Sequence, residues 1–171
     1  MINLITCGGQ TSIPIIVGIK NILNRKLNYV ELVSSISAKS AGKATRENID
    51  EYITNTENAI RQITNVNKTK VIINISPTTP PINMMNSLFF ETKKKISKKE
   101  FSLIKKEVKN INIKIKFYIP GYNALVFKQL NNNIIRITIR VVGQGDYLPK
   151  YAGNLDIITS AAMQLSKQIN N

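Results

Sequence analysis

The sequence predicts a single α+β domain, residues 1–171, built on a mixed sheet. Its 171 residues suit one domain with a buried core. Strand and helix patterns alternate in the first half of the chain, whereas strand patterns follow one another in the second half, which is typical of this class. The predicted strands are the alternating or β-branched runs Ile2–Cys7, Tyr29–Ser37, Lys70–Ile75, Met84–Glu91, Ile111–Ile119, Ala124–Leu130 and Ile134–Val142.

Four helices are expected between these strands. They are expected over Ser12–Asn24, after Thr45, from Ser97 and from near Asn154. Thr11 or Ser12 caps the first helix. Ser97 forms a capping box with Glu100 three residues later, and Asn154 is the expected cap of the last helix. The second helix carries isoleucines at helical spacing, which predicts a stripe facing the core: Ile49, Ile53, Ile60 and Ile63.

The composition excludes several kinds of site. The chain has no His and a single Cys. A Ser-His-Asp triad, a Cys-His dyad, a cysteine or histidine zinc site and an internal disulfide are therefore all excluded. The missing disulfides and the lack of a signal-peptide pattern at the N-terminus favour a cytoplasmic protein. Two long uncharged stretches, Met1–Ile19 and Val71–Phe90, are interrupted by polar residues or prolines, so neither predicts a membrane span.

The net charge of +14 raises the question of nucleic-acid binding. Lys supplies 19 of the 24 positive charges, and the chain is rich in Ile and Asn as well. This combination is typical of a protein encoded by an A+T-rich genome. The lysines between residues 93 and 109 have no interleaved Tyr, Gly or Arg that would stack on bases. We therefore expect a solvated helix face and no specific nucleic-acid binding.

Cys7 is the first candidate for chemistry, because it stands before a predicted helix and is followed by Gly8 and Gly9. A thiol near a helix N-terminus has its pKa lowered by the helix dipole and by unpaired N–H groups, which favours a nucleophilic thiolate. The two glycines allow the backbone to approach a substrate closely. The alternative is that Cys7 is a small buried apolar residue at the end of a strand, as lone cysteines commonly are.

Two further segments lead into helices, Ser37–Asn48 and Gly143–Ser160. Backbone N–H groups at such a position bind phosphate or an oxyanion, although an ordinary capped loop has the same composition. No GxGxxG pattern and no Walker lysine occurs in the chain. The sequence therefore predicts no dinucleotide fingerprint or P-loop of its own.

Several motifs together resemble one family along essentially the whole chain. They are Thr6–Gln10 (TCGGQ) with Ile13 and Pro14, Ser35–Ser37, Lys39–Gly42 (KSAG), Thr45 with Arg46, Asn48–Glu51 (NIDE), Pro77 with Pro80 and Pro81, Tyr118–Tyr122 (YIPGY) and Gly145–Ala162 (GDYLPKYAGNLDIITSAA). In this order they are similar to the C-terminal half of the acylating acetaldehyde dehydrogenases. The resemblance implies a largely antiparallel sheet with helices on one face, similar to the catalytic domain of glyceraldehyde-3-phosphate dehydrogenase. No segment resembles the NAD-binding Rossmann half of the family, so we expect this half to be missing.

The resemblance implies a role for each motif. Cys7 is then the nucleophile that carries the acyl group between acetaldehyde and coenzyme A, with NAD as the oxidant. The residues implied to contact NAD are Ser40, Ala41, Gly42, Lys43, Ala44, Thr45, Arg46, Glu47, Asn48 and Asn154. Asn48, Ile49 and Ile73 match positions that line the acyl pocket. The implied partners are a second copy of the chain, a 4-hydroxy-2-oxovalerate aldolase and a separately encoded Rossmann chain.

Asn86 is a departure from the family, because it aligns with the carboxylate that acts as general base. An amide does not accept that proton, so base catalysis worth roughly 10² to 10⁴ in rate is lost there. On this argument Asn86→Asp is expected to raise the rate of acyl transfer. The alternative function is a catalytically silent interaction domain that docks to a partner such as the aldolase.

Overall fold

The structure is a computed structural model that describes residues 4–23, 27–66 and 68–169. In chain order its elements are α1 (Cys7–Leu23), β1 (Leu27–Ser37), α2 (Lys43–Glu47), α3 (Ile49–Thr64), β2 (Lys68–Ser76), β3 (Met84–Thr92), α4 (Lys98–Lys116), β4 (Tyr122–Gln129), β5 (Ile134–Val141), the 3-10 helix η2 (Lys150–Ala152) and α5 (Gly153–Ile169). The strands form one sheet in the order β2-β1-β3-β5-β4. Only β1 and β2 are parallel, and the other neighbours are antiparallel. The predicted α+β class with a mixed, largely antiparallel sheet is confirmed.

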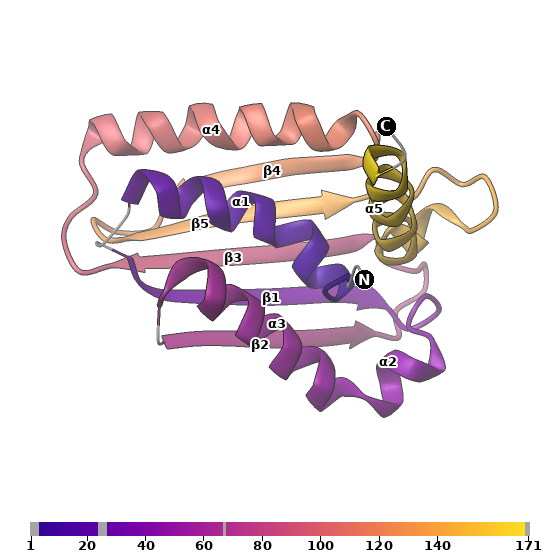
Figure 1. Cartoon of the computed structure of the whole chain (residues 1–171). Coiled ribbons are helices and arrows are strands. Elements are labelled where there is room, and N and C mark those ends of the chain that lie inside the picture. The colour runs from indigo at the N-terminus through magenta and orange to yellow at the C-terminus, as the bar shows by residue number, and fades with distance from the viewer. Residues whose placement is uncertain (1–3, 24–26, 67, 170–171) are drawn as a thin grey trace.

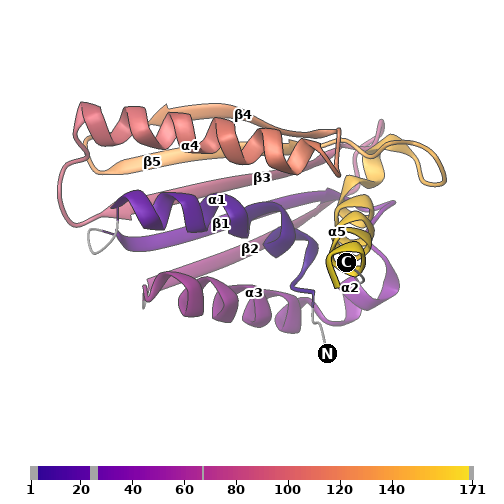
Figure 2. The same cartoon turned by 45° about the horizontal axis from the view of Figure 1, so that its top comes forward.

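The long helices cover one face of this sheet. Helices α1, α3 and α4 lie side by side on that face, and α5 crosses the end near the start of α1 (Figures 1 and 2). The core fills the space between the two layers, because alternate strand residues point toward the helices. Fully buried examples are Leu32 on β1, Leu88 on β3 and Ile137 on β5. No helix of the described residues covers the opposite face, which we call the bare face.

Helix α4 includes a segment that was predicted to be a strand, Ile111–Ile119. The segment alternates isoleucine with polar residues and so fits a strand, but Ile104, Val108, Ile111 and Ile115 are all buried on one face of a single helix. The capping box of Ser97 with Glu100 starts this helix as expected, and the helix continues until shortly before Pro120. The predicted strand was wrong because the segment satisfies both periodicities and only packing decides between them.

The N-terminal segment also differs from the prediction. Helix α1 begins at Cys7, and the described residues 4–6 are not a strand; residues 1–3 and Asn24 lie outside the described part of the chain. Thr6 acts as the cap, because its Oγ1 accepts a hydrogen bond from Gly9 N at 3.1 Å. Thr11 and Ser12, the predicted caps, lie within α1 after its first turn, and their side chains are buried in the protein. The β-branched run before Cys7 had suggested a strand and so concealed the cap.

The remaining elements agree with the prediction, apart from details at their ends. The strand predictions over Tyr29–Ser37, Lys70–Ile75, Met84–Glu91, Ala124–Leu130 and Ile134–Val142 correspond to the five strands. The helix after Thr45 is divided into α2 and α3. Asn154 is not a cap, because it lies within α5 and its side chain is buried. No helix of the described residues is long and apolar enough to cross a membrane.

Candidate active site at Cys7

Cys7 is the first residue of α1 and is half-buried. Its Sγ lies 3.7 Å from the hydroxyl of Tyr52 on α3. Burial raises the pKa of the Cys7 thiol above its usual value, whereas hydrogen bonds from Tyr52 and from the backbone of Gly8 and Cys7 lower it. Burial is the largest of these effects. The lowered pKa expected from the helix N-terminus is therefore not what the structure gives, because desolvation of the sulfur outweighs the donors around it.

A cluster of buried polar side chains lies behind Cys7. The polar cluster consists of Ser12 on α1, Ser34 on β1, Tyr52 on α3 and Asn86 on β3. Tyr52 OH donates to Ser34 Oγ at 3.3 Å, and Ser34 Oγ donates to Asn86 Oδ1 at 2.6 Å. The Asn86 amide nitrogen then donates to Ser12 Oγ at 2.8 Å. Four elements are thereby connected by a continuous chain of hydrogen bonds that starts beside the thiol.

Asn86 is placed as an internal support of this cluster. It is fully buried, and its Nδ2 also donates to the carbonyl oxygen of Gly8 at 3.2 Å. Both amide protons and the amide oxygen therefore have partners within the protein. These bonds join the first turn of α1 to the sheet. In this position Asn86 orients the backbone next to Cys7.

The two glycines after Cys7 are required for close packing. A Cβ on Gly8 would lie 2.2 Å from the Tyr52 hydroxyl oxygen and 2.7 Å from Ser34 Oγ. A Cβ on Gly9 would lie 2.5 Å from Cγ2 of Ile5. The sequence suggested that these glycines make room for a substrate. In the structure Gly8 makes room for Tyr52, whose hydroxyl also accepts a hydrogen bond from Gly8 N at 3.0 Å.

The segment expected to contact NAD lies at the end of β1 and is joined to the last helix. Asn154 Nδ2 donates to the carbonyl oxygen of Ser40 at 3.0 Å, although the two residues are 114 positions apart in sequence. Ser40, Ala41 and Asn154 are all buried. The other amide atom, Asn154 Oδ1, is buried and has no partner. The structure thus brings Asn154 and Ser40 together and leaves one acceptor unsatisfied there. Contact of either residue with NAD stays a prediction.

The rest of this segment faces solvent or supports the turn. Arg46 Nη2 donates to the carbonyl oxygen of Ala38 at 2.6 Å, and its Nε donates to that of Ala41 at 3.1 Å. The guanidinium therefore closes the turn between β1 and α2. The other predicted positions in this turn and helix α2 are half-buried at Thr45 and exposed at Gly42, Lys43, Ala44, Glu47 and Asn48.

The predicted acyl-pocket residues lie on two elements. Asn48 and Ile49 form the junction of α2 and α3, where Asn48 Nδ2 donates to the carbonyl oxygen of Ala44 at 3.0 Å. Ile73 lies on β2, is half-buried and packs against the core. Helix α3 packs on β2, so these residues belong to one side of the sheet.

Tyr52, Ser34 and Ser12 were not among the site residues expected from the sequence. The buried residues of α3 occur at every fourth position and include only one of the predicted isoleucines: Tyr52, Thr56, Ile60 and Thr64. Ile49, Ile53 and Ile63 are half-buried. The predicted stripe was therefore displaced, because polar hydroxyl residues occupy three of the four inward positions. The signal available in the sequence was the spacing of the hydroxyl residues of α3, because Tyr52 and Thr56 stand four positions apart on one helix face.

Comparison with known proteins decides the family. The family described as "Prokaryotic acetaldehyde dehydrogenase, dimerisation" matches residues 7–149, which is more than half of the chain. The chain belongs to this acetaldehyde dehydrogenase family. The acetaldehyde dehydrogenase of Pectobacterium atrosepticum is 42% identical over 170 residues, covering 99% of this chain and 56% of that protein. The acetaldehyde dehydrogenase of Bacillus cereus is 38% identical over 167 residues, covering 98% of this chain and 54% of that protein.

This member of the family spans about half the length of the curated relatives it matches. The match begins at Cys7, so it includes the thiol, the polar cluster and the whole sheet. The described fold is accordingly that of a dimerisation domain of the acetaldehyde dehydrogenase family.

Proposed function

We propose that the chain is the catalytic and dimerisation half of an NAD-dependent acylating acetaldehyde dehydrogenase, with Cys7 as its nucleophile. The observation that carries this proposal is the position of the only thiol. It stands at the first residue of α1, next to a hydrogen-bonding hydroxyl, at the start of the region that matches the family. The relatives over this region are named acetaldehyde dehydrogenases, which supports acetaldehyde as the substrate.

In the proposed reaction the Cys7 thiolate adds to the carbonyl carbon of acetaldehyde, and the carbonyl oxygen takes up a proton. When bound, NAD would supply the hydride acceptor. Loss of the hydride from this carbon and of the proton from its oxygen to solvent leaves a thioester on Cys7. The thiol of coenzyme A then attacks the thioester carbon. The Cys7 sulfur leaves, acetyl-CoA is released, and the proton of the coenzyme A thiol passes to solvent or back to Cys7.

The segment expected to contact NAD fits a bound nicotinamide cofactor at one point. Asn154 Oδ1 is a buried acceptor without a partner, next to the turn that contains Ser40 and Ala41. An amide N–H of the cofactor would satisfy this oxygen. Arg46 is a weaker candidate for the cofactor, because its donors already hold the turn. The Rossmann domain would come from another chain or from a longer form of this one.

The bare face of the sheet supports the second part of the proposal, a homodimer. Its apolar side chains are Val33, Ile72, Met85, Phe89 and Ile134. Ile72 is 37% and Met85 is 41% exposed. The same face carries charges of both signs, on Glu31, Lys68, Lys70, Glu91, Arg136 and Arg140. A second copy would therefore offer groups of the opposite sign to both the acidic and the basic positions.

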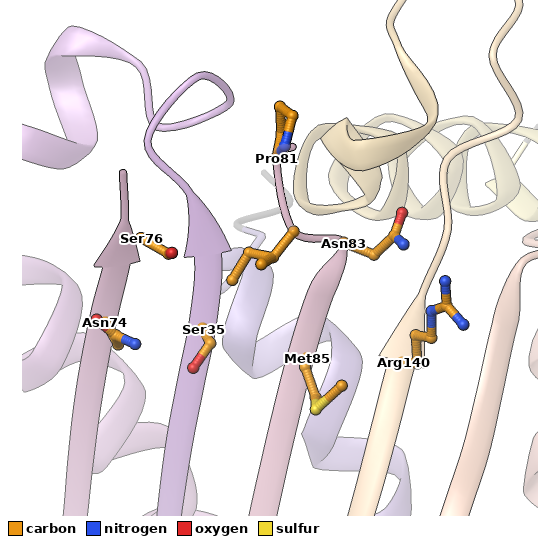
Figure 3. Close-up of a pocket in the computed structure, with 8 residues that line it drawn as sticks. Ser35, Asn74, Ser76, Pro81, Asn83, Met85 and Arg140 are labelled. Carbon is orange, nitrogen blue, oxygen red and sulfur yellow. The ribbon is translucent and has the colours of Figure 1, made fainter. Parts of the chain in front are cut away.

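The bare face is also hollowed. A cavity of about 500 Å³ lies between the ends of β1, β2, β3 and β5 (Figure 3). It is lined by Ser35, Asn74, Ser76, Pro81, Ile82, Asn83, Met85 and Arg140. With the Asn83 amide oriented to satisfy its neighbours, its oxygen accepts from Arg140 Nη2 at 2.7 Å. The cavity lies across the sheet from Cys7, because Ser35 points away from the face on which Ser34 contacts Asn86. A second copy would cover it.

One observation favours a different function, a silent interaction domain that docks to a partner such as an aldolase. Asn86 stands where the resemblance implies a catalytic carboxylate, and its amide is fully used in structural hydrogen bonds. The intact position of Cys7 favours the enzyme.

The test uses the half-reaction that needs no NAD domain, the transfer of an acetyl group from acetyl-CoA to Cys7. Intact-mass spectrometry measures the adduct on the wild type and on Cys7→Ser. Because the chain has 19 lysines that acetyl-CoA also modifies slowly, each sample is then treated with neutral hydroxylamine, which cleaves a thioester but leaves acetyl-lysine intact. We expect a hydroxylamine-sensitive adduct on the wild type alone. A folded wild type without this adduct would support the interaction domain.

A further inference from the structure

We propose that Tyr52 positions and stabilises the Cys7 thiolate by donating a hydrogen bond from its hydroxyl to Sγ when the thiol ionises. The proposal rests on the proposed function in that it takes Cys7 as the nucleophile. The evidence for it is the set of hydrogen-bond distances that connect Cys7 to Tyr52, Tyr52 to Ser34 and Ser34 to Asn86. Tyr52 is thereby a positioning residue, while Cys7 carries the acyl group.

The direction of each hydrogen bond in the polar cluster follows from one fixed acceptor. The carbonyl oxygen of Gly8 accepts only, so the Asn86 amide nitrogen must face it, and Asn86 Oδ1 must face Ser34. The Ser34 proton is then committed to Asn86 Oδ1 at 2.6 Å. Consequently Ser34 Oγ accepts a hydrogen bond from the Tyr52 hydroxyl and cannot donate one to it.

The Tyr52 hydroxyl has one proton, and both Ser34 Oγ and Cys7 Sγ lie near it as acceptors. Its oxygen accepts the Gly8 N–H at 3.0 Å, which leaves its own proton to point at Ser34 Oγ, 3.3 Å away, or at Cys7 Sγ, 3.7 Å away. A thiolate is a stronger acceptor than a serine hydroxyl, because hydrogen bonds to a charged group are stronger. Loss of the thiol proton thus turns the Tyr52 O–H from Ser34 toward Cys7.

Tyr52 acts in this arrangement as a donor and not as a base. Burial raises the pKa of Tyr52, and the neighbouring Cys7 charge raises it further, so the hydroxyl keeps its proton throughout the accessible pH range. The hydrogen bond from Tyr52 in turn lowers the pKa of Cys7 against the effect of burial. Among the described residues, Tyr52 is the titratable side chain that acts on Cys7; the other groups that lower its pKa are backbone N–H groups.

The test measures the ionisation of Cys7 directly and needs no acyl donor. The rate of alkylation by iodoacetamide is followed by intact mass as a function of pH, and the single cysteine of the chain makes the signal unambiguous. The variant is Tyr52→Phe, which removes only the hydroxyl. The matched control is Tyr29→Phe, whose hydroxyl lies on the bare face and bonds to Glu31. Far-UV circular dichroism verifies that each variant is folded.

We expect the pKa of Cys7 in Tyr52→Phe to rise by about one unit, so that alkylation below that pKa becomes roughly tenfold slower. Tyr29→Phe should behave as the wild type. Ser34→Ala provides a change of opposite sign: it removes the competing acceptor, so the Tyr52 proton is left to face Sγ and the pKa of Cys7 should fall. If Tyr52→Phe does not fold, Ser34→Ala decides alone.

Equal alkylation profiles for Tyr52→Phe and the wild type would overturn the proposal. A pKa that rises in Ser34→Ala would also overturn it, because general disruption of the cluster and not a shared proton would then explain both variants. Failure of the proposed function is a separate result: a wild type that accepts no acetyl group can still show the pKa shift in Tyr52→Phe.

Discussion

Replacing Asn86 by Asp tests the structural role of this residue most directly. The side chain keeps its size but exchanges two amide protons for a second oxygen. That oxygen would face the carbonyl oxygen of Gly8, which is now 3.2 Å from the amide nitrogen. Asn86 is fully buried, and no Lys or Arg is among its hydrogen-bond partners. The structure therefore predicts that Asn86→Asp is destabilising, whereas the family comparison alone predicted faster acyl transfer.

The size of the effect depends on pH. With the new carboxyl protonated, one of the two donated hydrogen bonds is lost, which costs about 1 kcal/mol. Burial without a cation raises the pKa of the new Asp above its unfolded value of about 3.9. Stability is then fully present below pH 3.9 and is lost as the pH rises toward the folded pKa, by up to about 1.4 kcal/mol per pH unit. If the folded pKa reaches 7, the additional loss at pH 7 is about 4 kcal/mol.

The assay is urea denaturation followed by far-UV circular dichroism at several pH values between 4 and 7.5. The matched control is Asn110→Asp, which makes the same charge change at an exposed position of α4. The free energy of unfolding of Asn86→Asp should fall below that of Asn110→Asp by an amount that grows with pH. A difference that stays constant over this range, or a variant as stable as the control, would refute the reasoning.

Three further predictions concern packing, association and capping. Gly153→Ala places a Cβ 2.4 Å from a backbone carbonyl oxygen of β5 and should lower the free energy of unfolding by about 1–3 kcal/mol. In the control Gly42→Ala the new Cβ has no neighbouring atom within 4 Å, so the melting temperature should be unchanged or higher. Phe89→Glu on the bare face should convert the proposed dimer to monomers in sedimentation velocity. Phe117→Glu, which replaces an 84% exposed ring just after the C-terminal end of α4, should remain dimeric. Ser97→Ala removes the capping box of α4 and should lower the free energy of unfolding in urea by about 1 kcal/mol. Equal effects within the glycine pair or within the phenylalanine pair, or no effect at Ser97, would contradict these expectations.

Local signals in the sequence were sufficient for much of the fold. The capping box of Ser97 and Glu100 depends only on residues three apart, and it begins α4 where expected. The segment Ile111–Ile119 shows the limit of such signals. Its isoleucines fit a strand by alternation and a helix by the spacing of Ile111 and Ile115, and the choice depends on α1 and β4, against which α4 packs.

The candidate site was predicted in part. The position of Cys7 next to a helix start was visible, although the helix begins at Cys7 itself because Thr6 is the cap. The hydrogen bond of Asn154 with Ser40 connects residues 114 positions apart. The resemblance to the family named both residues as NAD contacts but did not indicate that they bond to each other. The role of Tyr52 was not predicted, because it depends on a contact between two helices. The Tyr52 hydroxyl on α3 reaches α1 only because Gly8 has no side chain at that point.

The edge position of β2 affects how copies of this protein meet. An edge strand exposes unpaired backbone groups and is a template for open-ended strand addition. Exposed Lys68 and Lys70 lie along β2, and prolines follow it at Pro77, Pro80 and Pro81. Like charges oppose the approach of a second β2, and proline has no N–H with which to extend the ladder. Strand addition at the β2 edge is thereby discouraged. Contact through the bare face joins two copies into a closed arrangement, whereas strand addition at an edge would lead to a growing fibre.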